Sequence, residues 1–160
     1  MSSNSLDKRD ILFNYVKEYL YLYYDFRAVQ VQMVNENLFK AVTDKGMMFE
    51  KNVEVHLYND FQFEKVIAVR QASRIRFSES NVYNDSHQRS REIYINCYLR
   101  LVFDTSLNYV TQGSEKGLFI CITTDARRIE LDITNGQIKV ISKTKTPVFV
   151  TDFKRSLKIY

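Results

Sequence analysis

The stretch from Arg91 to Asp104 reads REIYINCYLRLVFD and is the clearest alternation of apolar and polar residues in the chain. One parity is apolar throughout and consists of Ile93, Ile95, Cys97, Leu99, Leu101 and Phe103. The other parity holds the polar and amphipathic residues Glu92, Tyr94, Asn96, Tyr98, Arg100 and Asp104. Because successive side chains of a β-strand point to opposite faces, this pattern predicts a strand with one buried and one solvated face, as in antiparallel sheets.

Shorter segments on both sides of this stretch share its two-residue period. The segments are 53–58 and 64–78 before it, and 118–124, 127–133, 137–142 and 148–153 after it. The Asn135-Gly136 pair between two of them is typical of a tight hairpin. Polar residues 79–90 and the region around Gly113–Gly117 are predicted to be loops. The sequence therefore predicts about six antiparallel strands without intervening helices.

The N-terminal region has a helical period instead. Apolar and aromatic residues at steps of three and four form one face, made of Leu12, Val16, Tyr19, Leu20, Tyr23 and Phe26. Asp7 and Asp10 before this face resemble an N-cap pair. The helical pattern continues less regularly to Leu38, and Gly46 is expected to end the helical region. Residues 29–33 also alternate like a strand, so a break near Arg27 is the alternative.

Together these patterns predict an α+β fold. An N-terminal amphipathic helix, continuous or broken, packs on a curved antiparallel sheet of about six strands. The chain of 160 residues is expected to form a single domain over 1–160. Residues 1–46 are expected to be mainly helical, and residues 52–153 mainly antiparallel strands.

Composition excludes several classes of protein. Hydrophobic residues make up 45% of the chain and charged residues 26%, which excludes disordered, collagen-like and coiled-coil proteins. The net charge is +4, and the excess of basic residues lies after residue 60. No apolar run is long enough for a membrane span. Cys97 and Cys121 lie in apolar segments and are expected to be buried, reduced thiols.

No recognised catalytic or metal-binding motif occurs. The sequence has no nucleophile elbow, no Walker loop and no glycine-rich dinucleotide turn. His56 and His87 have no partner at a known motif spacing, and Cys97 and Cys121 lack a zinc-ligand spacing. We therefore expect no catalytic residue, no metal site and no cofactor.

The basic residues offer a candidate binding surface. It would consist of Arg70, Arg74, Arg76, Arg127 and Arg128, with Tyr94 and Tyr98 on the solvated face of their predicted strand. Arginines for phosphates and rings for bases could form a platform for single-stranded nucleic acid. The favoured interpretation is a contact with another subunit or a packed helix, because Tyr and Arg are enriched at protein interfaces.

A second candidate surface is the tyrosine-rich N-terminal helix. Its five tyrosines lie around the whole circumference and are Tyr15, Tyr19, Tyr21, Tyr23 and Tyr24. A sheet can cover one face of a helix, which would leave an exposed aromatic surface for a partner. The alternative is that a curved sheet wraps most of the helix.

The order of elements resembles a known family. The helical segment FNYVKEYL at 13–20, followed by long strands and the final stretch TPVFVTDFKR at 146–155, is similar to the cone-shaped fold of nuclear transport factor-like domains. Within that group it is similar in outline to periplasmic or surface domains of type IV secretion and conjugation assembly factors. The resemblance implies a non-enzymatic, self-associating scaffold subunit. It assigns no functional residue to this chain.

The leading hypothesis is therefore a structural or interaction subunit of a larger assembly, such as secretion, conjugation or phage-type machinery. Its expected partners are other protein subunits, including copies of itself. The alternatives are a nucleic-acid-binding protein with a basic sheet face and a small-ligand binder with a pocket between helix and sheet. We expect a cytoplasmic location if Met1 is the natural start, and a cell-surface or periplasmic one if the chain is an excised domain.

Overall fold

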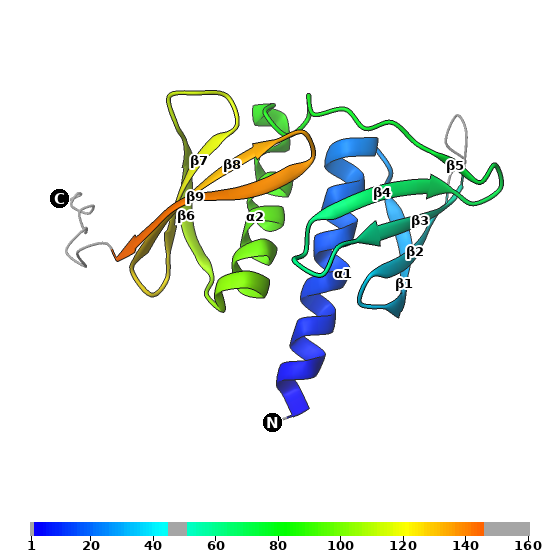
Figure 1. Ribbon diagram of the computed structural model, residues 1–160, viewed down its shortest axis with the longest axis horizontal. Coiled ribbons are helices and arrows are strands. Elements are labelled where there is room, and N and C mark those ends of the chain that lie inside the picture. Colours follow the sequence, from blue (N-terminus) through cyan, green and yellow to red (C-terminus); the bar gives the residue numbers. More distant parts are fainter. Residues whose placement is uncertain (1, 45–50, 146–160) are drawn as a thin grey trace. The chain divides into compact units, whose positions relative to one another are not determined.

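The computed structural model describes residues 2–44 and 51–145 (Figure 1). The elements that precede and include the second helix are α1 Ser2–Tyr24, β1 Ala28–Asn35, β2 Leu38–Thr43, β3 Asn52–Leu57, β4 Phe63–Ala68, β5 Ser73–Arg74, the short 3₁₀ helix η1 Asp85–His87 and α2 Gln88–Phe103. The later strands are β6 Leu107–Gln112, β7 Leu118–Thr123, β8 Arg127–Thr134 and β9 Gln137–Lys145. Antiparallel strands and an N-terminal helix confirm the predicted α+β class.

The chain divides into two compact units, each with its own sheet. The first unit comprises residues 1–104 with the turn 135–137, and the second comprises the remaining residues from 105 onward. The first sheet has the strand order β1-β2-β3-β4-β5, and the second has the order β6-β7-β8-β9. The predicted single sheet of about six strands is therefore wrong. The expectation of a single domain over 1–160 stays a prediction.

Helix α1 has the buried face that its spacing predicts. Leu12, Val16 and Leu20 are at most 1% exposed, because the steps of three and four place them on one side. The helix already begins at Ser2, so Asp7 and Asp10 lie inside it and the predicted N-cap pair is wrong. It ends at Tyr24.

Residues 28–43 form a hairpin and not the predicted continuation of the helix. Asp25 has a positive φ of 53°, which helical residues do not adopt, and this ends α1 just before Arg27. Strands β1 and β2 then pair antiparallel through a turn in which Asn35 Oδ1 accepts a hydrogen bond from Asn37 N at 2.7 Å. The alternative of a break near Arg27 is confirmed, and the prediction that 1–46 is mainly helical is wrong for this segment.

The first sheet packs one face against α1. In Figure 1 the helix runs alongside the cyan and green strands of this sheet. Its inward residues are fully or nearly fully buried and include Phe39, Ala41, Val53, Val55, Leu57, Phe63, Val66 and Ala68. Strand β3 confirms the predicted strand near 53–58. The segment 64–78, predicted as one strand, instead turns back after β4, and Ile67 pairs with Arg74 of β5.

The stretch 91–104 forms helix α2, so the predicted strand is wrong. Its buried positions Arg91, Tyr94, Ile95, Tyr98 and Leu99 are spaced three or four residues apart in pairs, which is the period of a helix. The helix ends where Asp104 takes a left-handed conformation with φ 55°. Both periods fit this sequence because tyrosines can count as polar or apolar. An intervening helix also explains why the strands form two sheets.

The second unit is a four-stranded antiparallel meander. Strands β7, β8 and β9 confirm the segments predicted at 118–124, 127–133 and 137–142, whereas β6 was not predicted. The alternating residues Phe119, Cys121, Ile129, Leu131, Ile133 and Ile138 are at most 2% exposed. The predicted strand 148–153 and the predicted helix end at Gly46 lie outside the described residues.

The β8–β9 turn generates a test of the fold. Asn135 and Gly136 have φ values of 56° and 72°, as a type I′ hairpin turn requires. Asn135→Ala should lower the free energy of unfolding by about 1 kcal/mol, because alanine is strained at positive φ. Asn135→Gly is the matched control, and its free energy of unfolding should decrease much less, because glycine adopts positive φ without strain. Urea denaturation followed by circular dichroism measures the free energy of unfolding of both variants. An equal decrease in the two would contradict a turn with positive φ at residue 135.

Candidate functional site

Tyrosines from α1 form the aromatic core of the first unit. Tyr19 stacks on Phe63 of β4 with ring centroids 3.6 Å apart and an interplanar angle of 1°. Tyr15 stacks on Tyr94 of α2 at 5.2 Å and donates its hydroxyl hydrogen to the carbonyl oxygen of Phe61 at 2.7 Å. Aromatic stacking contacts thus hold helix α1 between the first sheet and α2.

This core corrects the predicted exposure of most tyrosines. Tyr15, Tyr19 and Tyr23 of the proposed helix interface are at most 2% exposed, so the sheet and α2 cover them. Tyr94 and Tyr98 are 0% and 4% exposed, so the prediction that they lie on a solvated strand face is wrong.

Tyr21 and Tyr24 are the two α1 tyrosines that stay half-exposed. The Tyr21 hydroxyl accepts a hydrogen bond from Arg27 Nη2 at 2.8 Å, and the Arg27 guanidinium lies 4.3 Å from the Tyr21 ring centre. The Arg27 guanidinium therefore already contacts the Tyr21 ring, whereas Tyr24 borders the pocket described below.

Burial also affects the ionisation of the core tyrosines. Desolvation raises the pKa of Tyr15 and of Tyr94 well above the usual value of 10.0. A deprotonated phenol is disfavoured among other rings because an uncompensated charge is costly in an apolar environment. These tyrosines therefore remain neutral at physiological pH and serve as packed rings.

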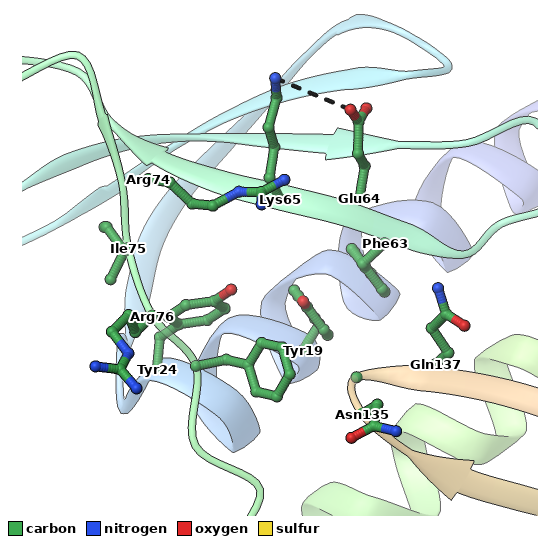
Figure 2. A pocket seen from close by; sticks show the side chains of 12 residues that line it. Tyr19, Tyr24, Phe63, Glu64, Lys65, Arg74, Ile75, Arg76, Asn135 and Gln137 are labelled. Carbon is green, nitrogen blue, oxygen red and sulfur yellow. Dashed lines mark ion pairs between the residues drawn. The ribbon is translucent and has the colours of Figure 1, made fainter.

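The candidate site is a pocket of about 440 Å³ in the first unit. Its lining residues come from α1, from β4, from the segment 74–77 and from the turn 135–137, and they are Tyr19, Tyr24, Phe63, Glu64, Lys65, Arg74, Ile75, Arg76, Phe77, Asn135, Gly136 and Gln137. Figure 2 shows the helix tyrosines on one side, with Arg74 and Arg76 on the extended segment beside them. The pocket thus adjoins both α1 and the first sheet.

Positive charge predominates around this pocket. Lys65, Arg74 and Arg76 line it with one carboxylate, Glu64, whose Oε2 lies 3.9 Å from Lys65 Nζ. Arg74 and Arg76 are both exposed, and the described residues give neither a carboxylate within ion-pair distance. The structure therefore brings together two of the predicted arginines. Arg70 does not line the pocket and lies after β4.

The half-buried ring of Tyr24 connects this charge to the core. Desolvation raises the pKa of Tyr24, while a hydrogen bond with Tyr19 and the positive charge of Arg74 oppose that rise. The hydroxyl of Tyr24 is therefore a neutral hydrogen-bonding group beside an arginine at physiological pH. Sequence reasoning selected Arg74, Arg76 and Tyr24 separately. It missed Phe63, Lys65 and Phe77 because only the chain's turn after β4 places them here.

The predicted arginines at 127 and 128 belong to the second unit and are neutralised there. Arg127 Nη2 lies 2.8 Å from Asp125 Oδ2, and Arg128 Nη2 lies 2.9 Å from Glu130 Oε2. An arginine already paired with a carboxylate contributes less to phosphate binding, since the pair must first be broken. The described structure therefore does not assemble the predicted five-arginine surface.

The edges of the two sheets differ in how they are protected. An unpaired edge strand can add a strand from another chain unless it is short, charged or bulged. Strand β5 has two residues, and β9 carries Lys139 and Lys143. The opposite edges, β1 with AVQVQMVN and β6 with LNYVTQ, contain no charged residue. In β1 the register shifts near both ends leave 30–33 as a regular segment.

The remaining candidates do not form a cluster. His56 lies beside Glu54 on β3, with Nε2 and Oε1 3.4 Å apart, and His87 Nδ1 lies 3.0 Å from Ser86 Oγ. Cys97 and Cys121 are free and buried, and desolvation raises the pKa of each thiol to about 12. Within 2–44 and 51–145, no group of three His, Cys, Asp or Glu side chains could hold a metal ion.

Comparison of the chain with protein-family models, with curated proteins and with solved structures found no match. The resemblance to nuclear transport factor-like domains therefore stays a prediction. No helix among the described residues is long and apolar enough to cross a membrane.

Asp125 generates a pH-dependent test in the second unit. Hydrogen bonds from Arg127, Thr123 and Thr105 hold the pKa of this carboxyl well below its usual value. A carboxyl with a lower pKa in the folded state stabilises the fold at pH values above its unfolded pKa of about 3.9. This stabilisation is lost progressively as pH falls from there through the lower pKa of the folded state. Asp125→Asn should therefore lower the melting temperature more at pH 7 than at about pH 2.5, where part of the stabilisation is already lost.

The control for this substitution is Glu115→Gln, which changes a carboxylate in the exposed loop between β6 and β7. Thermal unfolding by circular dichroism at both pH values gives the comparison. An equal decrease in the melting temperature of Asp125→Asn at both pH values would contradict a stabilising role of the ionised carboxylate.

Proposed function

We propose that this protein is a non-enzymatic interaction subunit that self-associates by antiparallel pairing of β1 with β1 of a second copy. The observation that carries the proposal is the uncharged edge at β1, an eight-residue strand whose only neighbour among the described strands of the sheet is β2. Strand addition at such an edge is a recurrent mode of protein recognition, because main-chain hydrogen bonds supply affinity without a dedicated pocket.

The occupant of this edge is argued from the sequence of the strand itself. Val31 and Met33 pair with the buried residues Ala41 and Phe39, so they lie on the helix-facing side of the sheet. Gln30 and Gln32 lie on the opposite side, where they pair with Val42 and Lys40 of β2, respectively.

In an antiparallel pair of identical strands, Val31 opposite Val31 places Gln30 opposite Gln32. This register keeps apolar residues on one side and amides on the other, and glutamine side chains can hydrogen-bond across the strands. The segment is therefore self-complementary, and the two sheets would join into one continuous sheet around a two-fold axis.

Strand β1 is a better edge for this contact than β6. Its regular segment carries the strict apolar–amide alternation, and Val29 and Val34 at its ends are 60% and 49% exposed. Exposed valines beside an unpaired strand extend the apolar area that a second copy would cover. In β6 the sequence LNYVTQ lacks such an alternation, so its pairing with itself is less specific.

A charge in the middle of β1 tests the interface. Val31→Lys should convert a dimer to a monomer of 19.0 kDa, because a lysine in the pairing segment would have to be desolvated. Val140→Lys is the matched control, since Val140 is a 40% exposed valine on the lysine-rich edge β9. Light scattering on the eluting protein across concentrations measures the mass. A wild type that is monomeric throughout would overturn the proposal.

Single cysteines test the register. Val31→Cys should form a disulfide-linked dimer on mild oxidation, because opposite residues have Cβ atoms about 5 Å apart. Gln32→Cys alone should form far less, since its counterpart is Gln30, whereas a mixture of Gln30→Cys and Gln32→Cys chains should cross-link. The native cysteines are buried and should not interfere. Non-reducing gels report the products, and cross-linking at 32 in preference to 31 would contradict this register.

The proposal keeps the class that the sequence predicted, an interaction protein in a larger assembly. A machine of the secretion, conjugation or phage type is the expected setting through the family resemblance, and a self-pairing sheet edge is compatible with a scaffold subunit of that kind. Nucleic-acid binding is the second candidate, and the adjacent pair Arg74 and Arg76 is the observation that favours it over the neutralised Arg127 and Arg128.

A further inference from the structure

We propose that the pocket bordered by α1, β4 and the segment 74–77 binds a small ligand in which an aromatic ring carries a phosphate group, as in a nucleoside monophosphate. The site is distinct from the proposed self-association edge. Strands β1 and β5 are the two opposite edges of the first sheet, and the pocket lies at the β5 side. A dimer through β1 would therefore leave the pocket accessible, and either proposal can fail without the other.

The size of the pocket suits a ligand of this class. Its volume of about 440 Å³ lies within the range of small-molecule sites. Tyr19 and Phe63, which are 2% and 4% exposed, provide a floor that is already stacked and held by the core. A rigid floor lowers the conformational entropy that ligand binding would otherwise cost.

The phosphate would lie at the cationic side of the pocket, which Arg74 and Arg76 line. These residues flank Ile75, whose backbone N–H donates to Val66 O at 2.9 Å, so the segment is held along β4. Both arginines line the pocket together with Lys65; in Figure 2 the Arg74 side chain extends towards Lys65, and the Arg76 side chain extends in another direction from the same segment. The lining thus holds three cations against one carboxylate, Glu64, which pairs with Lys65, so an anion in the pocket would be attracted by the excess positive charge. Arginine forks also match the geometry of phosphate oxygens.

The aromatic part of the ligand would contact Phe77 and Tyr24. Phe77 is 42% exposed although it is a large apolar residue, and its ring packs edge-on against Tyr23 at 5.7 Å. Tyr24 is half-exposed on the helix side of the same pocket. A planar ring placed against these side chains would cover apolar area and stack, which every aromatic base can do.

The experiment is isothermal titration of the full chain at low ionic strength with AMP, adenosine and inorganic phosphate. AMP should bind about tenfold more tightly than either fragment, because it alone fills both halves of the pocket. Added salt should weaken AMP binding, since the phosphate contact is electrostatic. The absence of any heat of binding with AMP up to about 10 mM would overturn the proposal.

Two variants separate the halves of the site. Arg74→Gln with Arg76→Gln should weaken AMP by about tenfold or more, as loss of charge-assisted hydrogen bonds does. Phe77→Leu should weaken AMP several-fold and leave phosphate binding unchanged. The matched control is Arg128→Gln with Lys139→Gln, which removes the same charge from exposed positions of the second unit and should leave AMP binding unchanged. If the control variant lost as much affinity for AMP, the effect would come from net charge in general, and this would overturn the proposed site.

Circular dichroism establishes that each variant is folded before binding is compared. Binding of phosphate as tight as that of AMP would overturn the aromatic half of the proposal. A single-stranded oligonucleotide that binds far more tightly than AMP, and loses that affinity in the double arginine variant, would replace a small ligand with nucleic acid.

Discussion

The ring stack that runs through α1 is the interaction on which the first unit depends. Tyr19 lies flat on Phe63 of the sheet, and Tyr15 lies flat on Tyr94 of α2, so one helix supplies a shared core to both sides. Rings bury large areas and prefer defined geometries, which makes such a contact both stabilising and directional. The floor of the pocket is the outer end of the same stack, so its shape follows from core packing.

The sequence predicts α1 well because every residue of its apolar stripe is apolar or aromatic. The prediction for α2 fails because its tyrosines are ambiguous. When Tyr94 and Tyr98 count as polar, the stretch alternates like a strand. When they count as apolar, Tyr94, Ile95, Tyr98 and Leu99 mark a helix face. A buried tyrosine can place its hydroxyl in a hydrogen bond, so the period alone does not show whether a tyrosine belongs to the buried or the exposed face.

The candidate site is harder to derive than the fold because it depends on where the chain turns. Arg74 and Arg76 are recognisable as basic residues two apart, but the hairpin after β4 is what sets them beside Tyr24. Conversely, Arg127 and Arg128 have the same local appearance and are occupied by nearby carboxylates. The lack of charge in β1 is visible in the sequence itself, but only the strand order shows that β1 is an edge of the first sheet within the described part of the chain.

The two cysteines have a consequence for how the molecule opens. Cys97 lies in the first unit and Cys121 in the second, and both thiols are buried with a pKa near 12. A buried thiol is modified only when its surroundings open and the thiolate can form. The chain thus carries one natural reporter in each unit. Equal labelling rates at the two positions would indicate that the units open together, and unequal rates would rank their local stabilities without any engineered probe.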